Sequence, residues 1–131
     1  MSSNLKESYE TFKTAYLKLK EFIETDEGTE KDRGAIINAY QYTFELWWKT
    51  LQKYLQQREI IEELGPSSTI RTAIQYEFID DKQEYMDLLR DRNLITHTYK
   101  EDTANYIYQR IKNIYVELLQ EFIKEFDKKI I

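Results

Sequence analysis

The sequence predicts an all-α fold, an antiparallel up-and-down bundle of about five helices, three long and two short. The 131-residue chain has only three glycines and one proline, so few residues interrupt helices. Between these breaks, apolar residues recur every three or four positions, which is the spacing of one helix face. The 41% hydrophobic content is enough for a core, and the length fits one domain over residues 1–131.

The first two predicted helices are long. The first begins at about Asn4, which we expect to be its N-cap, and its apolar stripe ends near Ile23. A polar loop follows, and Asp32 is the expected N-cap of a second helix that extends to about Arg58. At 1.5 Å per residue this second helix is roughly 40 Å long, so it sets the height of the bundle.

A short third helix is expected after the strongest break in the chain, Gly65–Ser68. Its serines, Ser67 and Ser68, are the expected caps, and its apolar positions reach Phe78. The pair Asp80–Asp81 is then expected to start a fourth, short helix.

The last third of the chain contains a turn and one more long helix. The fourth helix runs towards Ile95, and its apolar pattern weakens over Thr96–Tyr99, where we expect a turn. Asp102 and Thr103 are the expected caps of the last helix, whose apolar stripe continues to Phe126.

Composition narrows the classes of function. Because 24 acidic and 19 basic residues give a net charge of −5, a broad basic face for duplex nucleic acid is not expected, although a local phosphate site is still possible. The absence of cysteine excludes disulfides, zinc–thiolate sites and cysteine nucleophiles, and it agrees with a reducing compartment. The first residues lack an apolar signal region, so we expect a cytoplasmic protein that does not cross a membrane.

The candidate for chemistry is the only histidine, His97. Imidazole is the side chain whose ordinary pKa lies nearest neutrality. Beside a guanidinium it suits metal-free cleavage of RNA, because histidine moves the proton of the ribose 2′-hydroxyl and arginine stabilises charge on phosphorus. Arg92 and Arg90 both lie at a suitable spacing before His97, and Asn93 is placed to orient either group.

Helix geometry limits how Arg92 and His97 can meet. They are five positions apart, and an ideal helix turns through about 500° over that distance, so the two side chains would diverge by roughly 140°. They meet only if the helix ends or kinks between them, or if two subunits share the site. A purely structural or surface role for His97 is therefore the alternative.

Other clusters have simpler explanations. The acidic pairs Glu62–Glu63 and Asp80–Asp81 lack a third ligand at helical spacing, so we expect solvated helix ends and no metal site. The neighbours Trp47–Trp48 point about 100° apart, so core or subunit-interface positions are expected rather than base stacking. Glu45 and Lys49 have the spacing of a helical ion pair. No glycine-rich nucleotide-binding motif is present, and we expect no cofactor.

Four segments of the chain resemble a known family. The run Arg92–Tyr99, RNLITHTY, resembles the R-x(4)-H-x-Y signature of the HepT toxins in the HEPN superfamily. The run Phe44–Leu51, FELWWKTL, resembles the F-E-x-x-W-K-x-L segment of the nucleotidyltransferase substrate-binding protein family, a branch of that superfamily. The segment Ser67–Phe78 resembles its next short helix, and Glu101–Ile111 resembles its final one. The second tryptophan, Trp48, is where the chain departs from the family pattern.

The resemblance implies a small helical bundle that forms a homodimer and a complex with a minimal nucleotidyltransferase of the MntA type. Several such proteins are metal-independent ribonuclease toxins. Carried over by position, Arg92 and His97 would be the catalytic pair and Asn93 would support the site. Tyr99 would be the tyrosine that the partner adenylylates to silence the toxin. A homodimer also resolves the geometric problem, because two such turns facing across a two-fold axis form one cleft.

Three functions are compatible with these residues. The first is a toxin ribonuclease, which we favour. The second is a non-catalytic subunit in which Arg92 and His97 hold the phosphate of the nucleotidyltransferase substrate. The third is an interaction bundle in which His97 and Tyr99 only close a helix turn. The first two differ in whether His97 is needed for RNA cleavage or only for binding.

Overall fold

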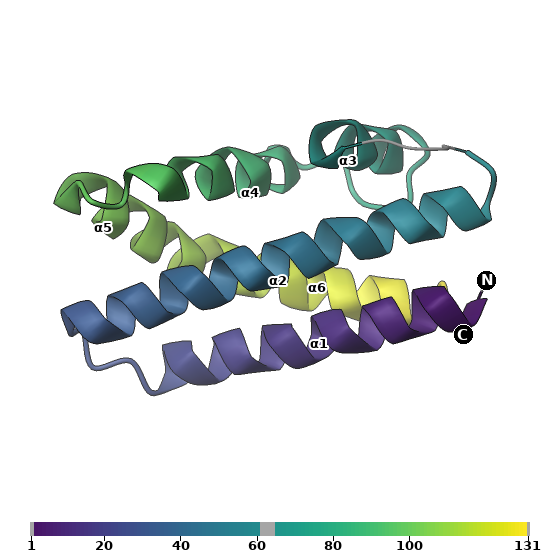
Figure 1. Cartoon of the computed structure of the whole chain (residues 1–131). Helices are drawn as coiled ribbons and strands as arrows, with labels where there is room; N and C mark the ends of the chain where they lie inside the picture. The colour runs from purple at the N-terminus through teal and green to yellow at the C-terminus, as the bar shows by residue number, and fades with distance from the viewer. Residues whose placement is uncertain (1, 61–64, 131) are drawn as a thin grey trace.

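The computed structural model describes residues 2–60 and 65–130, and within these residues the chain is helical and contains no strand (Figure 1). The α-helices are α1 (Ser2–Glu24), α2 (Glu30–Gln57), α3 (Pro66–Gln75), α4 (Gln83–Leu94), α5 (Glu101–Arg110) and α6 (Val116–Asp127). A 3-10 turn, Ile95–His97, extends α4, and a π segment, Ile111–Tyr115, joins α5 to α6. The predicted all-α class is confirmed.

The helices form an up-and-down bundle of four antiparallel rods (Figure 1). α1 and α2 form a hairpin, α3 and α4 follow one another along the third rod, and α5 with α6 forms the fourth. α2 contacts α1, α3, α4 and α5, so it is the central helix. Both termini lie at one end, where Tyr9 Oη donates a hydrogen bond to Asp127 Oδ1 at 2.6 Å. When α5 and α6 are counted as one long helix, the prediction of three long and two short helices is confirmed.

Aromatic side chains fill the space between the rods. Trp47 of α2 is fully buried, stacks on Tyr85 of α4 with ring centroids 5.7 Å apart, and meets Phe122 of α6 edge-on at 5.8 Å. Tyr40 of α2 stacks on Tyr115 of the π segment at 5.4 Å. The expected core position is therefore confirmed for Trp47. None of the helices within residues 2–60 and 65–130 is long and apolar enough to cross a membrane.

The predicted caps of the first two helices are wrong. α1 begins at Ser2, so Asn4 lies inside the helix. The N-cap of α2 is Thr29, whose Oγ1 accepts from the backbone N–H of Asp32 at 3.0 Å. The Asp32 carboxylate instead accepts from the backbone N–H of Glu27 at 2.8 Å. Asp32 thus ties the preceding loop to the first turn of α2, where a negative charge is also favourable.

The start and end of α3 also differ from the prediction. Gly65 is the N-cap and Pro66 is the first helical residue, so Ser67–Ser68 lies inside the helix and is not its N-cap. Proline suits the first helical position because its missing N–H would have no partner there. α3 ends before Phe78, because Glu77 adopts a left-handed backbone conformation with φ of 60°.

The N-caps of α4 and α5 are lysines rather than the predicted Asp80–Asp81 and Asp102–Thr103. Asp80–Asp81 precedes Lys82, the N-cap of α4, and Asp102–Thr103 lies within α5, after its N-cap Lys100. Neither lysine forms a side-chain cap hydrogen bond. Acidic residues near these helix starts still interact favourably with the helix dipole. The expected turn is present but begins later than predicted, because the chain stays helical through His97.

Candidate functional site

The predicted site residues lie where α4 ends and the chain turns towards α5. Arg92 and Asn93 are in the last turn of α4, and the chain then tightens into the 3-10 turn Ile95–His97. Tyr99 follows in an irregular turn and is 77% exposed. The rings of His97 and Tyr99 form an edge-to-face pair with centroids 6.0 Å apart. All of these residues therefore lie within two helical turns at one end of α4.

Arg92 is oriented by side chains of α2. Its Nη2 lies 2.7 Å from Glu45 Oε1, and its guanidinium carbon lies 5.3 Å from the centre of the Phe44 ring. Trp48 Nε1 donates to the other oxygen of Glu45, Oε2, at 3.1 Å. The predicted ion pair between Glu45 and Lys49 is wrong, since no such pair is formed among the described residues. Because a guanidinium matches a carboxylate better than an ammonium does, Arg92 takes the place of Lys49.

The part played by Phe44, Glu45 and Trp48 was missed from the sequence. All three belong to the F-E-x-x-W segment, which the sequence offered only as a mark of the family. The spacing of Glu45 and Trp48 is the signal that was available, because residues three apart lie on the same helix face. Arg92 also donates from Nη1 to Asn93 Oδ1 at 3.2 Å, so Asn93 contacts the arginine that it was expected to support.

His97 presents an exposed imidazole. Its carbonyl accepts the backbone N–H of Lys100 at 3.1 Å, but within the described part of the chain its imidazole forms no hydrogen bond or ion pair. The chain is helical from Arg92 to His97, so the divergence expected for a continuous helix applies. No hydrogen bond joins these two side chains within residues 2–60 and 65–130.

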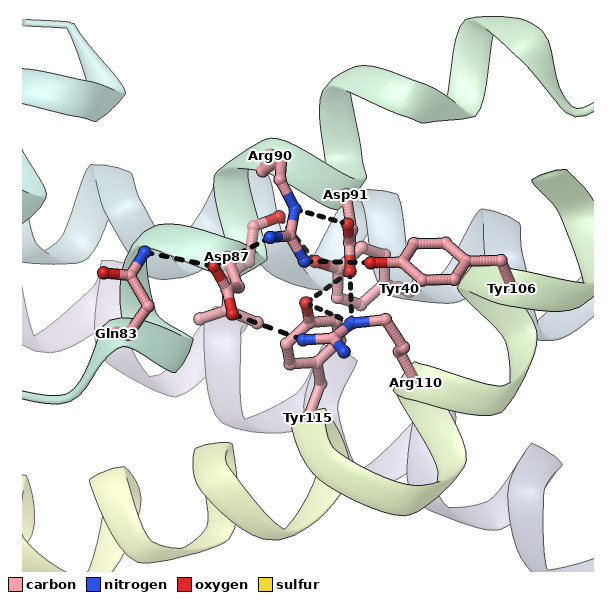
Figure 2. Close-up of polar contacts among 9 residues, drawn as sticks. Tyr40, Gln83, Asp87, Arg90, Asp91, Tyr106, Arg110 and Tyr115 are labelled. Atoms are coloured by element: carbon pink, nitrogen blue, oxygen red, sulfur yellow. Dashed lines mark hydrogen bonds and ion pairs between the residues drawn. The ribbon is translucent and has the colours of Figure 1, made fainter.

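Arg90, the other arginine at a suitable spacing, points to the opposite side of α4. Residues two positions apart in an α-helix point about 200° apart around its axis, so Arg90 and Arg92 face different neighbours. Arg90 Nη2 donates to Tyr106 Oη of α5 at 2.9 Å, and its Nε donates to Asp91 Oδ1 at 3.1 Å (Figure 2). Arg92 instead faces Glu45 of α2.

A polar cluster lies on the Arg90 side of α4. We name it the Asp91 cluster, and it consists of Gln83, Asp87, Arg90, Asp91, Tyr106, Arg110 and Tyr115 (Figure 2). Asp91 has no exposed surface and accepts from Arg90 Nε at 3.1 Å, from Arg110 Nε at 2.8 Å and from Tyr115 Oη. Burial and the hydrogen bond to Asp91 raise the pKa of Tyr115, so the hydroxyl stays protonated at neutral pH.

The same cluster also stabilises the positive charge of Arg110. Burial lowers the pKa of the guanidinium, but its hydrogen bonds to Tyr115 and Asp91 and its attraction to them outweigh burial and leave the pKa raised. The two sides of α4 therefore differ: one presents a single arginine to α2, and the other carries two arginines paired with the buried carboxylates of Asp87 and Asp91.

Of the two acidic pairs, the structure describes only Asp80–Asp81. Asp80–Asp81 is exposed just before α4, as expected for a solvated helix end. The pair Glu62–Glu63 lies outside the described residues. Within residues 2–60 and 65–130, no group of three His, Asp or Glu side chains is arranged to hold a metal ion.

Known proteins that are similar to this chain include a curated relative and a solved structure. A Haemophilus influenzae protein named "Probable ribonuclease HepT" is 27% identical over 85 residues, which are 62% of this chain and 58% of that protein. The chain therefore spans less than two thirds of the length of this curated relative. A crystal structure of a Thermus thermophilus protein matches with a TM-score of 0.78 and 31% identity, covering 86% of this chain and 96% of that one.

A family model covers nearly the whole chain. Residues 7–128 match the family described as "Nucleotidyltransferase substrate binding protein like". This range includes the α2 segment that orients Arg92 as well as Arg92, His97 and Tyr99. The resemblance inferred from sequence motifs is thereby confirmed, and the chain belongs to the nucleotidyltransferase substrate-binding protein family with HepT-like members.

Proposed function

We propose that the protein is a metal-independent endoribonuclease of the toxin type, which acts as a homodimer and is controlled by a minimal nucleotidyltransferase of the MntA type. The observation that carries this proposal is the contrast between the paired guanidinium of Arg92 and the exposed imidazole of His97. Arg92 is held in place by Glu45, whereas the imidazole of His97, at the end of the same helical segment, is exposed and has no hydrogen-bond partner in the described chain.

The chemistry needs an acid–base group and a fixed positive charge. In the proposed reaction an imidazole of His97 takes the 2′-hydroxyl proton, and the 2′-oxygen attacks the adjacent phosphorus. The bond from phosphorus to the 5′-oxygen breaks, and a second imidazole protonates that oxygen. The products are a 2′,3′-cyclic phosphate and a 5′-hydroxyl. Arg92 stabilises the negative charge on the phosphoryl oxygens, and Asn93 supports Arg92 through its hydrogen bond.

A homodimer supplies what one chain lacks. Within one chain, Arg92 faces α2 while His97 lies further along a continuous helical segment. A two-fold axis beside the 3-10 turn would place Arg92 of one copy near His97 of the other and would bring two imidazoles into one cleft. The acidic net charge is tolerated because such a site contacts only one phosphodiester.

The test is RNA cleavage by the purified protein in EDTA. We expect the wild type to cleave RNA but not DNA of the same sequence, because DNA lacks the attacking 2′-hydroxyl. His97→Ala and Arg92→Ala should abolish cleavage, while Arg71→Ala, which removes an exposed arginine of α3, should not. Circular dichroism checks that each variant folds. Cleavage of DNA, or a requirement for a divalent metal ion, would contradict the proposal.

A non-catalytic, nucleotide-binding subunit is the second candidate, and the printed family description favours it. In that case none of the proteins cleaves RNA, mass spectrometry finds Tyr99 unmodified, and His97→Ala and Arg92→Ala weaken nucleotide binding. Arg71→Ala again serves as the matched control.

Tyr99 is the proposed control point. Its hydroxyl is on a highly exposed side chain next to His97, so an attached adenylyl group adds charge and bulk at the site. The tyrosine oxygen would attack the α-phosphorus of ATP and release pyrophosphate. With the nucleotidyltransferase and ATP, the wild type and Tyr76→Phe should gain one adenylyl group and lose activity, whereas Tyr99→Phe should not. Tyr76 is a suitable control because it is 50% exposed. Modification at another tyrosine would contradict this assignment.

A further inference from the structure

The Asp91 cluster joins α4 to α5 and to the π segment through paired charges. Arg110 bridges both carboxylates, with Nη2 3.3 Å from Asp87 Oδ2 and Nε 2.8 Å from Asp91 Oδ2. Arg90 bridges the other oxygens, with Nη1 3.2 Å from Asp87 Oδ1 and Nε 3.1 Å from Asp91 Oδ1 (Figure 2). Two positive and two negative charges thus alternate around the cluster, which leaves no unpaired charge in the buried space.

The π segment aligns Arg110 and Tyr115 on one carboxylate. In an α-helix, residues five apart point about 140° away from each other. Here the N–H of Val116 donates to the carbonyl of Ile111, and such i to i+5 bonds bring residues five apart to the same side. Arg110 Nε and Tyr115 Oη therefore both donate to Asp91 Oδ2, and Arg110 Nε also lies 3.2 Å from Tyr115 Oη.

Asp91 directly precedes Arg92, a residue of the proposed site, in the last turns of α4. Arg92 follows it directly and projects about 100° away, towards Glu45. From Asp91 to His97 the chain is one helical segment, first α and then 3-10. The rotation of the end of α4 about its axis consequently sets the direction of Arg92 and the position of His97.

Stability alone is a weak explanation for such a cluster. Apolar side chains of similar volume commonly fill a buried space with equal or greater stability than an ion pair. Arginine forks that bridge two carboxylates restrict orientation, because each hydrogen bond is directional. The cluster is therefore suited to holding α4 at one angle of rotation about its own axis and disfavouring nearby angles.

We propose that Asp91 is a positioning residue of the ribonuclease site: through Arg110 and Tyr115 it fixes the rotation of the α4 end, and with it the direction of Arg92 and the place of His97. This inference rests on the proposed function and adds a group that does not touch the RNA.

A chemically matched control exists elsewhere in the molecule. Asp26 accepts from Tyr108 Oη, lies 3.0 Å from Lys112 Nζ, and has a side chain that is only 4% exposed. It belongs to the connection between α1 and α2, outside the α4 segment. Asp26→Asn therefore makes the same chemical change as Asp91→Asn at a carboxylate whose partners, Tyr108 and Lys112, do not belong to α4.

The first measurement is the kinetics of RNA cleavage in EDTA. We expect Asp91→Asn to lower kcat about tenfold or more, because small displacements of reacting groups have large effects on rate. KM should change much less, since Arg92 and His97 are still present. Tyr115→Phe, which keeps the carboxylate, should lower kcat in the same direction, and Asp26→Asn should leave kcat within about twofold of wild type. An equal loss in Asp26→Asn and Asp91→Asn would overturn the proposal in favour of a general effect of stability.

The second measurement does not depend on catalysis. Because His97 is the only histidine, its imidazole resonances in NMR spectra report on the site without further assignment. We expect Asp91→Asn and Tyr115→Phe to shift these resonances and Asp26→Asn to leave them in place. If Asp91→Asn does not fold, Tyr115→Phe decides the result. Unchanged His97 resonances in the folded variants of the Asp91 cluster would overturn the proposal. If the wild type does not cleave RNA, the proposed function fails, while the resonances still decide whether Asp91 positions His97.

Discussion

Two buried aspartates of this protein have similar partners but different surroundings. Each accepts a hydrogen bond from a tyrosine of the fourth rod, formed by α5 and α6, and lies beside a cation of the same rod. The partners of Asp26 are Tyr108 and Lys112, which are four positions apart in the sequence. The partners of Asp91 are Arg110 and Tyr115, which are five positions apart and separated by the π segment.

The difference between the two regions lies in what each carboxylate restrains. Asp26 is in a loop, and its second oxygen accepts from the backbone N–H of Gly28 at 3.0 Å. Its cation is a lysine, which acts as a point charge and leaves orientation free. Asp91 is inside a helix and is held by two planar guanidinium groups. The Asp26 region thus fixes the place of a loop, whereas the Asp91 cluster fixes the rotation of a helix.

The largest expected effect separates the two carboxylates by stability. Asp91→Ala leaves the buried Tyr115 hydroxyl without its acceptor and leaves Arg110 with Asp87 as its remaining carboxylate, and removing one partner of a buried pair costs about 3–5 kcal/mol. Asp26→Ala should cost about 1–3 kcal/mol, because Lys112 can turn towards solvent. Urea unfolding followed by circular dichroism measures both free energies. Equal losses would remove the distinction drawn between the two regions.

A smaller effect is expected for the tyrosine hydroxyls. Tyr115→Phe should lower the free energy of unfolding by about 2 kcal/mol, because a hydrogen bond to a buried charged group is lost. Tyr108→Phe should cost about 1 kcal/mol, since Asp26 keeps the Gly28 N–H and Lys112 as partners. The same unfolding experiment applies. A greater loss of unfolding free energy in Tyr108→Phe than in Tyr115→Phe would contradict the prediction that the Asp91 cluster depends more on its tyrosine.

The Asp26 region should also respond to acid. The hydrogen bond from Tyr108 lowers the pKa of Asp26, helped by the Gly28 N–H and by Lys112 and opposed by burial. The folded pKa thus lies below the unfolded value, so the stabilising contribution is present above about pH 4 and is lost as the pH falls through the folded pKa. The stability difference between wild type and Asp26→Asn should therefore shrink on acidification. Unfolding curves at several pH values measure it, and a constant difference would contradict the assignment.

The smallest expected effect concerns the outer cation of the Asp91 cluster. The Arg90 side chain is 51% exposed, so solvent screens its ion pairs with Asp87 and Asp91. Arg90→Gln should lower the free energy of unfolding by less than about 1 kcal/mol. Arg110→Gln is the matched comparison, because this side chain is 22% exposed, and it should cost more. Equal losses of unfolding free energy in Arg90→Gln and Arg110→Gln would contradict this order and show that the exposed Arg90 contributes as much as Arg110.

Much of the fold could be predicted from the sequence, but the helix starts could not. The three- and four-residue spacing of apolar side chains is a property of each segment, so it located the long and short helices correctly. The caps at Asn4 and Asp32 were placed wrongly because several polar residues near each start can accept the same N–H groups. Which residue becomes the N-cap depends on small differences in the path of the backbone. At α2 the cap is Thr29, and the predicted cap Asp32 donates its backbone N–H to it.

The sequence by itself determined the class of fold, the family motif and the position of Arg92, His97 and Tyr99 at one turn. Only the tertiary structure decided that Arg92 faces Glu45, that Arg90 faces Asp91, and that a π segment aligns Arg110 with Tyr115. The physical reason is the range of the interactions. Hydrophobic spacing acts within one helix, whereas the partner of a buried charge is set by which charged groups the other helices bring within hydrogen-bond distance.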